Sequence, residues 1–131
     1  MKVSNLDAAC ATLGHELGTS GQKPKDTENS LTKALGVLEE QGVYAMFLYL
    51  HAREKEFGKS TSKKLMEFLR QNVPGNWSAD KDNEPFGDLQ DLAKNLDNLL
   101  FARDLLHQAL VYARYHAKAA GAGTDREGAC K

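Results

Sequence analysis

Two stretches of this chain concentrate side chains that can bind phosphate groups. Lysine and arginine hold phosphate oxygens through charge-assisted hydrogen bonds, and such contacts supply much of a protein's affinity for a nucleic-acid backbone. Residues 51–79 carry a net charge of +3 and residues 99–131 a net charge of +2. We expect both stretches to share one outer surface. The basic side chains of these stretches include Arg53, Lys55, Lys59, Lys63, Lys64, Arg70, Arg114 and Lys118.

Three of these lysines are predicted to lie at the start of a helix. The segment FGKST interrupts the apolar periodicity, so Ser60 or Thr61 is expected to cap the helix that follows. Lys59, Lys63 and Lys64 would then lie where the helix dipole disfavours positive charge. Free backbone NH groups at that helix start would add donors for a phosphate. The alternative interpretation is an ordinary solvated face.

An acidic segment separates the two basic stretches. Residues 80–98 carry a net charge of −4. Arg103 occupies a position in a row otherwise formed by leucine and alanine, which is unusual for a charged side chain. We expect Arg103 either to pair with an acid of this segment or to line an interface.

Catalytic and metal-binding patterns are weak in this sequence. Asp104 and His107 have the i, i+3 spacing of a carboxylate and an imidazole that share a metal in helix bundles, but no second such pair occurs. His15, His51 and His116 are scattered along the chain and are expected to be surface or packing residues. No nucleotide-binding, zinc-binding or hydrolase motif is found. We therefore expect no metal, no cofactor and no enzymatic activity.

The elements that position these residues are predicted to be helices. The chain has 131 residues, of which 41% are hydrophobic and 27% charged, as in a single globular domain. Eighteen leucines and sixteen alanines stand against five valines and no isoleucine, which strongly disfavours a sheet. The predicted fold is all-α, a compact bundle of about five helices that forms one domain over residues 1–131.

The N-terminal part is predicted to form two helices joined by a linker. Apolar residues at helical spacing indicate a first helix within residues 1–18. Residues 19–29 are polar, contain glycine and proline, and are expected to form a mobile linker. A second helix is predicted from Leu31 to Glu40, with Asn29 or Ser30 as its cap.

The central part is predicted to cross the core and then leave it. Residues 43–50 are apolar on every face, and we interpret them as a buried helix preceded by a kink or a close helix contact at Gly42. After the third helix, residues 72–86 are expected to form the longest loop. Residues 88–120 are expected to form two helices with a break near Asp97 and Asn98. A flexible tail is predicted for residues 121–131.

The sequence also indicates where the protein resides. Asp7 interrupts any apolar region of a secretory signal, and the longest apolar run has eight residues where a membrane helix needs about 20. Cys10 and Cys130 are far apart in sequence and are interpreted as free thiols in a reducing compartment, although a disulfide between them is a less favoured alternative. These observations predict a cytoplasmic protein with no membrane association.

Two segments resemble a known family. The sequences LTKALGVLEEQGVYAMFLYL and ARDLLHQALVYARYHAKA are similar to parts of the small all-helical subunit of type III CRISPR RNA-guided effector complexes, particularly the III-B form. The similarity covers about residues 30–120 and lies in the order of the helices, the glycine before an apolar helix and the basic last helix. The sequence pI of about 6.4 is lower than expected for an RNA-contacting member.

The resemblance implies a non-catalytic subunit in antiviral defence. Such a subunit stacks head to tail with copies of itself, contacts other subunits of the effector complex, and holds the guide and target RNA through the lysines and arginines named above. The acidic segment would then face a neighbouring subunit, because opposite charge patches favour head-to-tail association. The candidate interface residues are Arg103, Asp80, Asp82, Glu84, Asp88 and Asp91.

Two other functions stay open. A helical-bundle ribonuclease of the HEPN kind carries an arginine and a histidine separated by four to six residues, whereas Arg103 and His107 are separated by three. A helical adaptor that binds only protein is the remaining alternative.

Overall fold

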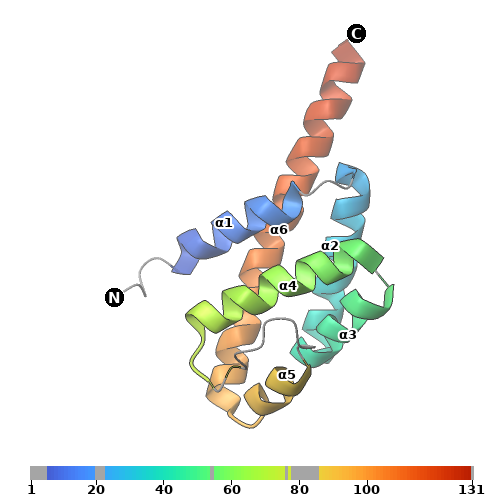
Figure 1. The fold of residues 1–131 in the computed structure, drawn as a ribbon. Coiled ribbons are helices and arrows are strands. Elements are labelled where there is room, and N and C mark those ends of the chain that lie inside the picture. Colours follow the sequence, from blue (N-terminus) through green and yellow to red (C-terminus); the bar gives the residue numbers. More distant parts are fainter. Residues whose placement is uncertain (1–5, 20–22, 54, 76, 78–85, 131) are drawn as a thin grey trace.

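Six helices account for almost all of the chain that the structure describes. The computed structural model describes residues 6–19, 23–53, 55–75, 77 and 86–130, without the side chains of Lys55 and residues 122–130. No strand occurs in these residues, so the predicted all-α bundle is confirmed (Figure 1). The helices are α1 (Leu6–Gly18), α2 (Pro24–Gln41), α3 (Val43–Arg53), α4 (Lys55–Asn72), α5 (Phe86–Leu92) and α6 (Leu96–Cys130).

The helices are arranged in two layers. α1 and α4 lie side by side and cross in front of α6 and α2 in Figure 1. α1 and α2 both pack on α6, while α3 packs on α2 and α4. The short helix α5 closes the lower end of the bundle beside α3 and the start of α6. The largest fully buried side chains are Phe47, Leu17, Leu31, Leu38, Met46, Leu50, Leu65, Leu69, Leu89, Leu106 and Leu110.

Helix α2 begins earlier than predicted. Pro24 stands in its first turn, where the missing NH is not needed and the fixed φ suits a helix. Thr27 and Ser30 are 0% and 8% exposed and continue the inward face toward Leu31. The prediction of a linker through Asn29 was therefore wrong, because polar residues on the buried face hid the helical period.

Gly42 ends α2 and separates it from α3. Its NH donates to the carbonyls of Val37 and Leu38, and its φ of 102° is a left-handed conformation that glycine adopts without strain. A Cβ at this position would meet no atom within 4 Å, so the expected close helix contact is absent. The prediction of a helix over residues 43–50 is confirmed, but only one side of it is buried. Met46 and Phe47 are fully buried, whereas Tyr44 and Leu48 are 37% and 47% exposed.

Helix α4 runs through the segment that was predicted to break it. Thr61 and Ser62 are both 2% exposed and lie in the interior of the helix. The Ser62 hydroxyl lies 2.9 Å from Nε2 of His51, which ties α4 to α3 and gives the buried hydroxyl a partner. Ser60 and Thr61 are therefore not caps, and the predicted helix start there was wrong.

The break between α5 and α6 lies three residues before the predicted one. Residues 93–95 form the turn, and the NH of Lys94 donates to the carbonyl of Asp91. Oδ1 of Asn95 accepts a hydrogen bond of 3.1 Å from the NH of Asn98, as an N-cap side chain does. Asn95, rather than Asp97 or Asn98, is thus the boundary residue.

The last helix continues to the end of the described chain. α6 reaches Cys130, so residues 121–130 are helical rather than the flexible tail that was predicted. In Figure 1 its final turns extend beyond the other helices. Among the described residues, none of the helices has the combination of length and apolar character that crossing a membrane requires.

Helix α1 docks on α6 through two glycines. A Cβ on Gly14 would lie 2.5 Å from Cβ of Tyr112 and 2.9 Å from the backbone nitrogen of Ala113. A Cβ on Gly18 would lie 2.5 Å from the carbonyl oxygen of Ala113. The hydroxyl of Tyr112 also donates to Asp7 at 2.6 Å, and this bond raises the pKa of the tyrosine. The two backbones therefore approach as closely as glycine permits.

The thiol of Cys10 is expected to be unreactive in the folded protein. It is 1% exposed and donates to the carbonyl oxygen of Leu105 at 3.7 Å. Burial, reinforced by the carboxylate of Asp7, raises the pKa of this thiol from 9.0 to about 11. At pH 8 the thiolate fraction is then about a hundredfold lower than in the unfolded chain.

The low reactivity of Cys10 can be tested by its labelling rate with a thiol reagent in a Cys130→Ser variant. Labelling should be much slower in the folded protein than in urea. Equal rates in both conditions would contradict the burial of Cys10.

The raised pKa of Cys10 also makes the stability of the protein depend on pH. The thiol's contribution to stability is present below about pH 9 and is lost as the pH rises toward 11, because the unfolded chain ionises first.

Candidate phosphate-binding surface

The exposed side of α4 carries the main group of available basic side chains. Lys59 and Lys63 are exposed and lie one turn apart, while Lys64 is half-buried and lines a groove between α4 and α1. Arg53 is exposed at the end of α3, directly before α4. Arg53, Lys59, Lys63 and Lys64 are called the α4 basic strip below.

Two acidic side chains of α4 flank the lysines of the strip without forming ion pairs to them. Glu56 and Glu67 are exposed on the same side of α4. Among the described residues the ion pairs within 4.0 Å are Arg70–Asp88, Lys94–Asp91 and His107–Glu39, and no member of the strip takes part in them. Arg53, Lys59 and Lys63 therefore face solvent and can exchange counterions for phosphates.

The position of the strip within the helix differs from the prediction. α4 begins at Lys55, so Lys59, Lys63 and Lys64 lie in the second and third turns and not at the helix start. Backbone NH groups there are bonded within the helix and offer nothing to an anion. Any phosphate contact would come from the side chains alone. The side chain of Lys55 lies outside the described part of the structure.

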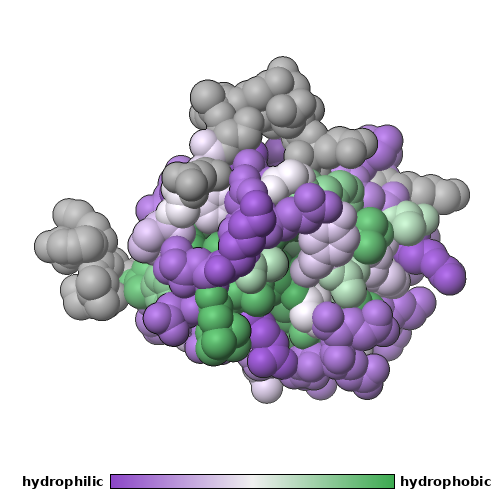
Figure 2. All heavy atoms as spheres, turned by 90° about the horizontal axis from the view of Figure 1, so that it is seen from below, coloured by the Kyte–Doolittle hydropathy of each residue, from purple (hydrophilic) through white to green (hydrophobic). Residues whose placement is uncertain are grey.

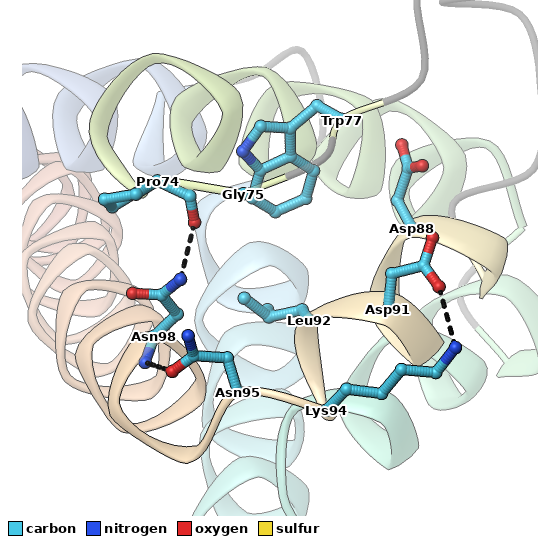
Figure 3. Close-up of a pocket in the computed structure, with 9 residues that line it drawn as sticks. All are labelled: Pro74, Gly75, Trp77, Asp88, Asp91, Leu92, Lys94, Asn95 and Asn98. Atoms are coloured by element: carbon cyan, nitrogen blue, oxygen red, sulfur yellow. Dashed lines mark hydrogen bonds and ion pairs between the residues drawn. The ribbon is translucent and has the colours of Figure 1, made fainter.

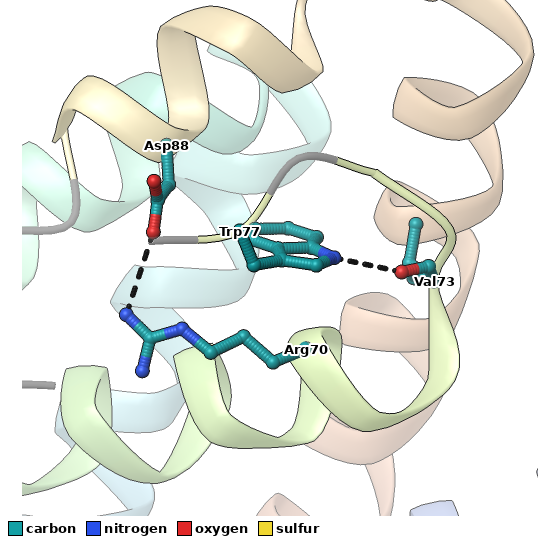
Figure 4. Close-up of polar contacts among 4 residues, drawn as sticks. All are labelled: Arg70, Val73, Trp77 and Asp88. Carbon is teal, nitrogen blue, oxygen red and sulfur yellow. Dashed lines mark hydrogen bonds and ion pairs between the residues drawn. The ribbon is translucent and has the colours of Figure 1, made fainter. Parts of the chain in front are cut away.

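Arg70 is held in the interior of the bundle rather than on the strip. Its guanidinium forms an ion pair of 3.4 Å with Asp88 of α5, and the two side chains are only 18% and 10% exposed (Figure 4). Nε of Arg70 is buried without a hydrogen-bond partner among the described residues. Arg70 and Asp88 thus join α4 to α5, and neither is presented to a phosphate or to a neighbouring subunit.

Arg114 and Lys118 belong to α6, which lies in the other layer of the bundle from α4. α6 buries its alanine-rich side, which carries Ala109, Ala113 and Ala117, within the bundle. Arg114 is half-buried and Lys118 exposed outside that side, whereas α4 belongs to the front layer with α1 in Figure 1. The two basic stretches therefore belong to different layers of the bundle, and the one shared surface that we expected stays a prediction.

A pocket of about 350 Å³ opens where α4 ends and α5 meets α6. The single tryptophan of the chain, Trp77, forms one wall, and its indole NH donates to the carbonyl of Val73 at 2.8 Å (Figures 3 and 4). Asp91 lies on the opposite rim and pairs with Lys94 at 3.4 Å. The pocket is thus close to neutral. It is lined by Pro74, Gly75, Trp77, Asp88, Asp91, Leu92, Lys94, Asn95 and Asn98.

The acidic interface candidates are only partly described. Asp80, Asp82 and Glu84 lie outside the described residues. Asp88 is 8% exposed and pairs with Arg70. Asp91 is exposed and is the one candidate of this set that the structure places at the surface.

Arg103 and His107 converge on one residue of α2. The guanidinium of Arg103 donates to the carbonyl oxygen of Glu39 at 3.1 Å, and Nε2 of His107 lies 2.7 Å from Oε2 of the same residue. Glu39 is in the last turn of α2, where carbonyl groups lack helical partners. Arg103 therefore caps the C-terminal end of α2 instead of pairing with the acidic segment. This role explains why a charged residue stands among the leucines and alanines of α6. The spacing of residues in the sequence did not indicate that Glu39 is the shared partner of Arg103 and His107.

Exposed apolar side chains mark a second kind of surface. Figure 2 views the end of the bundle where α5 lies and shows hydrophobic atoms between hydrophilic ones. On α3, Leu48 is 47% exposed, and at the start of α6, Leu96 and Leu100 are 64% and 46% exposed. Leu96 and Leu100 lie one turn apart on α6, so together they form a small apolar area that suits a contact with another protein.

Comparisons with known proteins identify no relative. No family model matches the chain, and searches of curated proteins and of solved structures return no significant match. The resemblance to the small subunit of type III complexes therefore depends on the sequence segments quoted above.

Proposed function

We propose that this protein is a non-catalytic, RNA-contacting small subunit of a type III CRISPR RNA-guided complex. The observation that carries the proposal is the α4 basic strip, in which Arg53, Lys59 and Lys63 are exposed and lie beyond ion-pair distance of any described carboxylate. Cations free of such partners release counterions from RNA when they meet its phosphates. The resemblance of residues 30–120 to that subunit supports the same function.

The proposed subunit contacts other subunits, and copies of itself head to tail, through surfaces away from the strip. Leu96 and Leu100 at the start of α6 supply apolar area, and Asp91 nearby is acidic and exposed. An apolar centre with a charged rim is the usual composition of a protein interface. Guide and target RNA would lie along α4, on the opposite layer of the bundle.

Binding of RNA is expected to depend on Lys59 and Lys63. A Lys59→Gln/Lys63→Gln variant should bind a 20-nucleotide single-stranded RNA about tenfold more weakly at 0.1 M salt, because two phosphate contacts are lost. The slope of log K against log salt concentration should become shallower by about 1.4. Fluorescence anisotropy over a salt series measures both quantities.

The matched control is a Lys25→Gln/Lys33→Gln variant. Both lysines are exposed on α2, so this variant removes the same charge from another surface. It should retain the affinity and the salt slope of the unmodified protein. An equal loss in both variants, or no binding of RNA by the unmodified protein, would contradict the proposal.

The assembly itself is testable by purification from the native host. A tagged full-length chain should copurify with RNA that carries a constant repeat-derived segment, together with large effector subunits. Recovery of the chain without RNA under conditions that preserve such complexes would count against a CRISPR subunit.

A nuclease is the second candidate, and one observation favours it. The contact of 2.7 Å between His107 and Glu39 resembles the carboxylate–imidazole pair that orients a general base, and Arg103 adjoins it. His107 and Glu39 are 41% and 56% exposed, so RNA can reach them. Purified protein in EDTA would then cleave RNA, and a His107→Ala variant would not. Intact RNA after long incubation rejects this candidate.

A further inference from the structure

Two histidines that are far apart in sequence lie together at the contact between α1 and α6. His15 is on α1 and His116 is on α6, and the centres of their rings are 5.0 Å apart with the ring planes at 88°. His15 is exposed and His116 is half-buried, so the pair is open to solvent. Imidazole nitrogen is a preferred ligand of zinc, nickel and copper ions.

The ring separation matches that of two imidazoles on one metal ion. A Zn–N bond is about 2.0–2.1 Å, so the centre of a bound ring is about 3.2 Å from the metal. With a tetrahedral angle of about 109°, two bound rings have centres about 5.2 Å apart. The observed 5.0 Å is close to this value. The rings are in an edge-to-face arrangement in this structure, so metal binding would require rotation about the soft χ2 torsions to bring one nitrogen of each ring toward the ion.

The backbone around the pair is held in place before any metal binds. A Cβ on Gly18 would lie 2.7 Å from Cβ of His116, and the contacts of Gly14 with Tyr112 and Ala113 fix the neighbouring turn. The two histidines therefore cannot move apart without opening the contact between α1 and α6. Binding then loses little conformational entropy, which favours even a site with few ligands.

We propose that His15 and His116 form a two-histidine site for a divalent d-block cation, represented by Zn²⁺, that joins α1 to α6. No group of three or more histidine, cysteine or acidic side chains suited to a metal occurs among the described residues. Water or a ligand from a partner would complete the coordination. Mg²⁺ and Ca²⁺, which prefer oxygen ligands, would not bind here.

The test measures thermal unfolding of untagged full-length protein with ZnCl2, NiCl2 or MgCl2. Zinc and nickel in about tenfold excess over their Kd should raise the Tm by about 5 °C, and magnesium should not. Isothermal titration should give one zinc ion per chain. The Tm rise should be lost in His15→Ala and in His116→Ala, and retained in His107→Ala, whose imidazole bonds to Glu39 instead.

His15 is exposed, so its removal leaves the core intact and the variant remains interpretable. The absence of zinc binding by the unmodified protein would overturn the proposal and leave the pair as an aromatic contact. A Tm rise that persists in both His15→Ala and His116→Ala would place the metal elsewhere and would overturn it equally.

Discussion

Replacement of Gly14 by alanine is expected to destabilise the protein by about 3 kcal/mol. The added Cβ would lie 2.5 Å from Cβ of Tyr112 and 2.9 Å from the backbone nitrogen of Ala113. Neither atom can move alone, because one is the base of a side chain and the other belongs to α6 itself. α1 must therefore shift away from α6, and packing around Cys10 and Leu17 is lost.

The matched control for this substitution is Gly36→Ala. Gly36 lies within α2, and a Cβ there would meet no atom within 4 Å. Alanine is a better helix former than glycine, so this variant should be more stable by up to about 1 kcal/mol. Urea denaturation followed by circular dichroism gives both values. Similar stabilities for the two variants would contradict the close contact between α1 and α6.

Replacement of Arg70 by methionine is expected to cost about 2 kcal/mol of stability. The change leaves the carboxylate of Asp88, which is 10% exposed, without its 3.4 Å ion pair. A buried charge that loses an ion-pair partner destabilises the fold, because part of its desolvation is no longer offset. The control is Lys59→Met, an exposed site where the change should stay within about 0.5 kcal/mol.

A double-mutant cycle separates the ion pair from other effects of the substitution. Asp88→Asn removes the charge and keeps the shape, so the Arg70→Met/Asp88→Asn protein should be at least about 1 kcal/mol more stable than the sum of the single effects predicts. Additive effects would show that the pair carries no coupling. If Arg70→Met loses more RNA affinity than its unfolded fraction explains, Arg70 contributes directly to RNA binding.

The sequence reveals the helical class and much of the core, because leucine and alanine recur at helical spacing. The buried row of α6, Leu106, Ala109, Leu110 and Ala113, is visible in this way. The residues at which α2 and α4 begin cannot be predicted from this spacing. Thr27 and Thr61 are polar but buried, and they interrupt the apolar pattern at positions where tertiary contacts outweigh local preference.

The candidate site is less predictable than the fold, because charges along a chain do not determine the direction in which side chains point. Lys63 on α4 and Lys118 on α6 are both exposed cations, yet their helices belong to different layers of the bundle. Arg70 looks like another exposed cation until α5 places Asp88 beside it. Glu39 and His107 are 68 residues apart, and no local pattern connects them.

The packing of α1 on α6 has a consequence for how the chain folds during synthesis. Tyr112 and Asp7, which are hydrogen-bonded, are 105 residues apart in sequence, so this contact closes a very large loop. Helices α2, α3 and α4 are neighbours in sequence and can associate while the ribosome is still translating the rest. Because α1 packs mainly on α6, it can dock only after α6 has emerged from the exit tunnel, so we expect this contact to form after those among α2, α3 and α4.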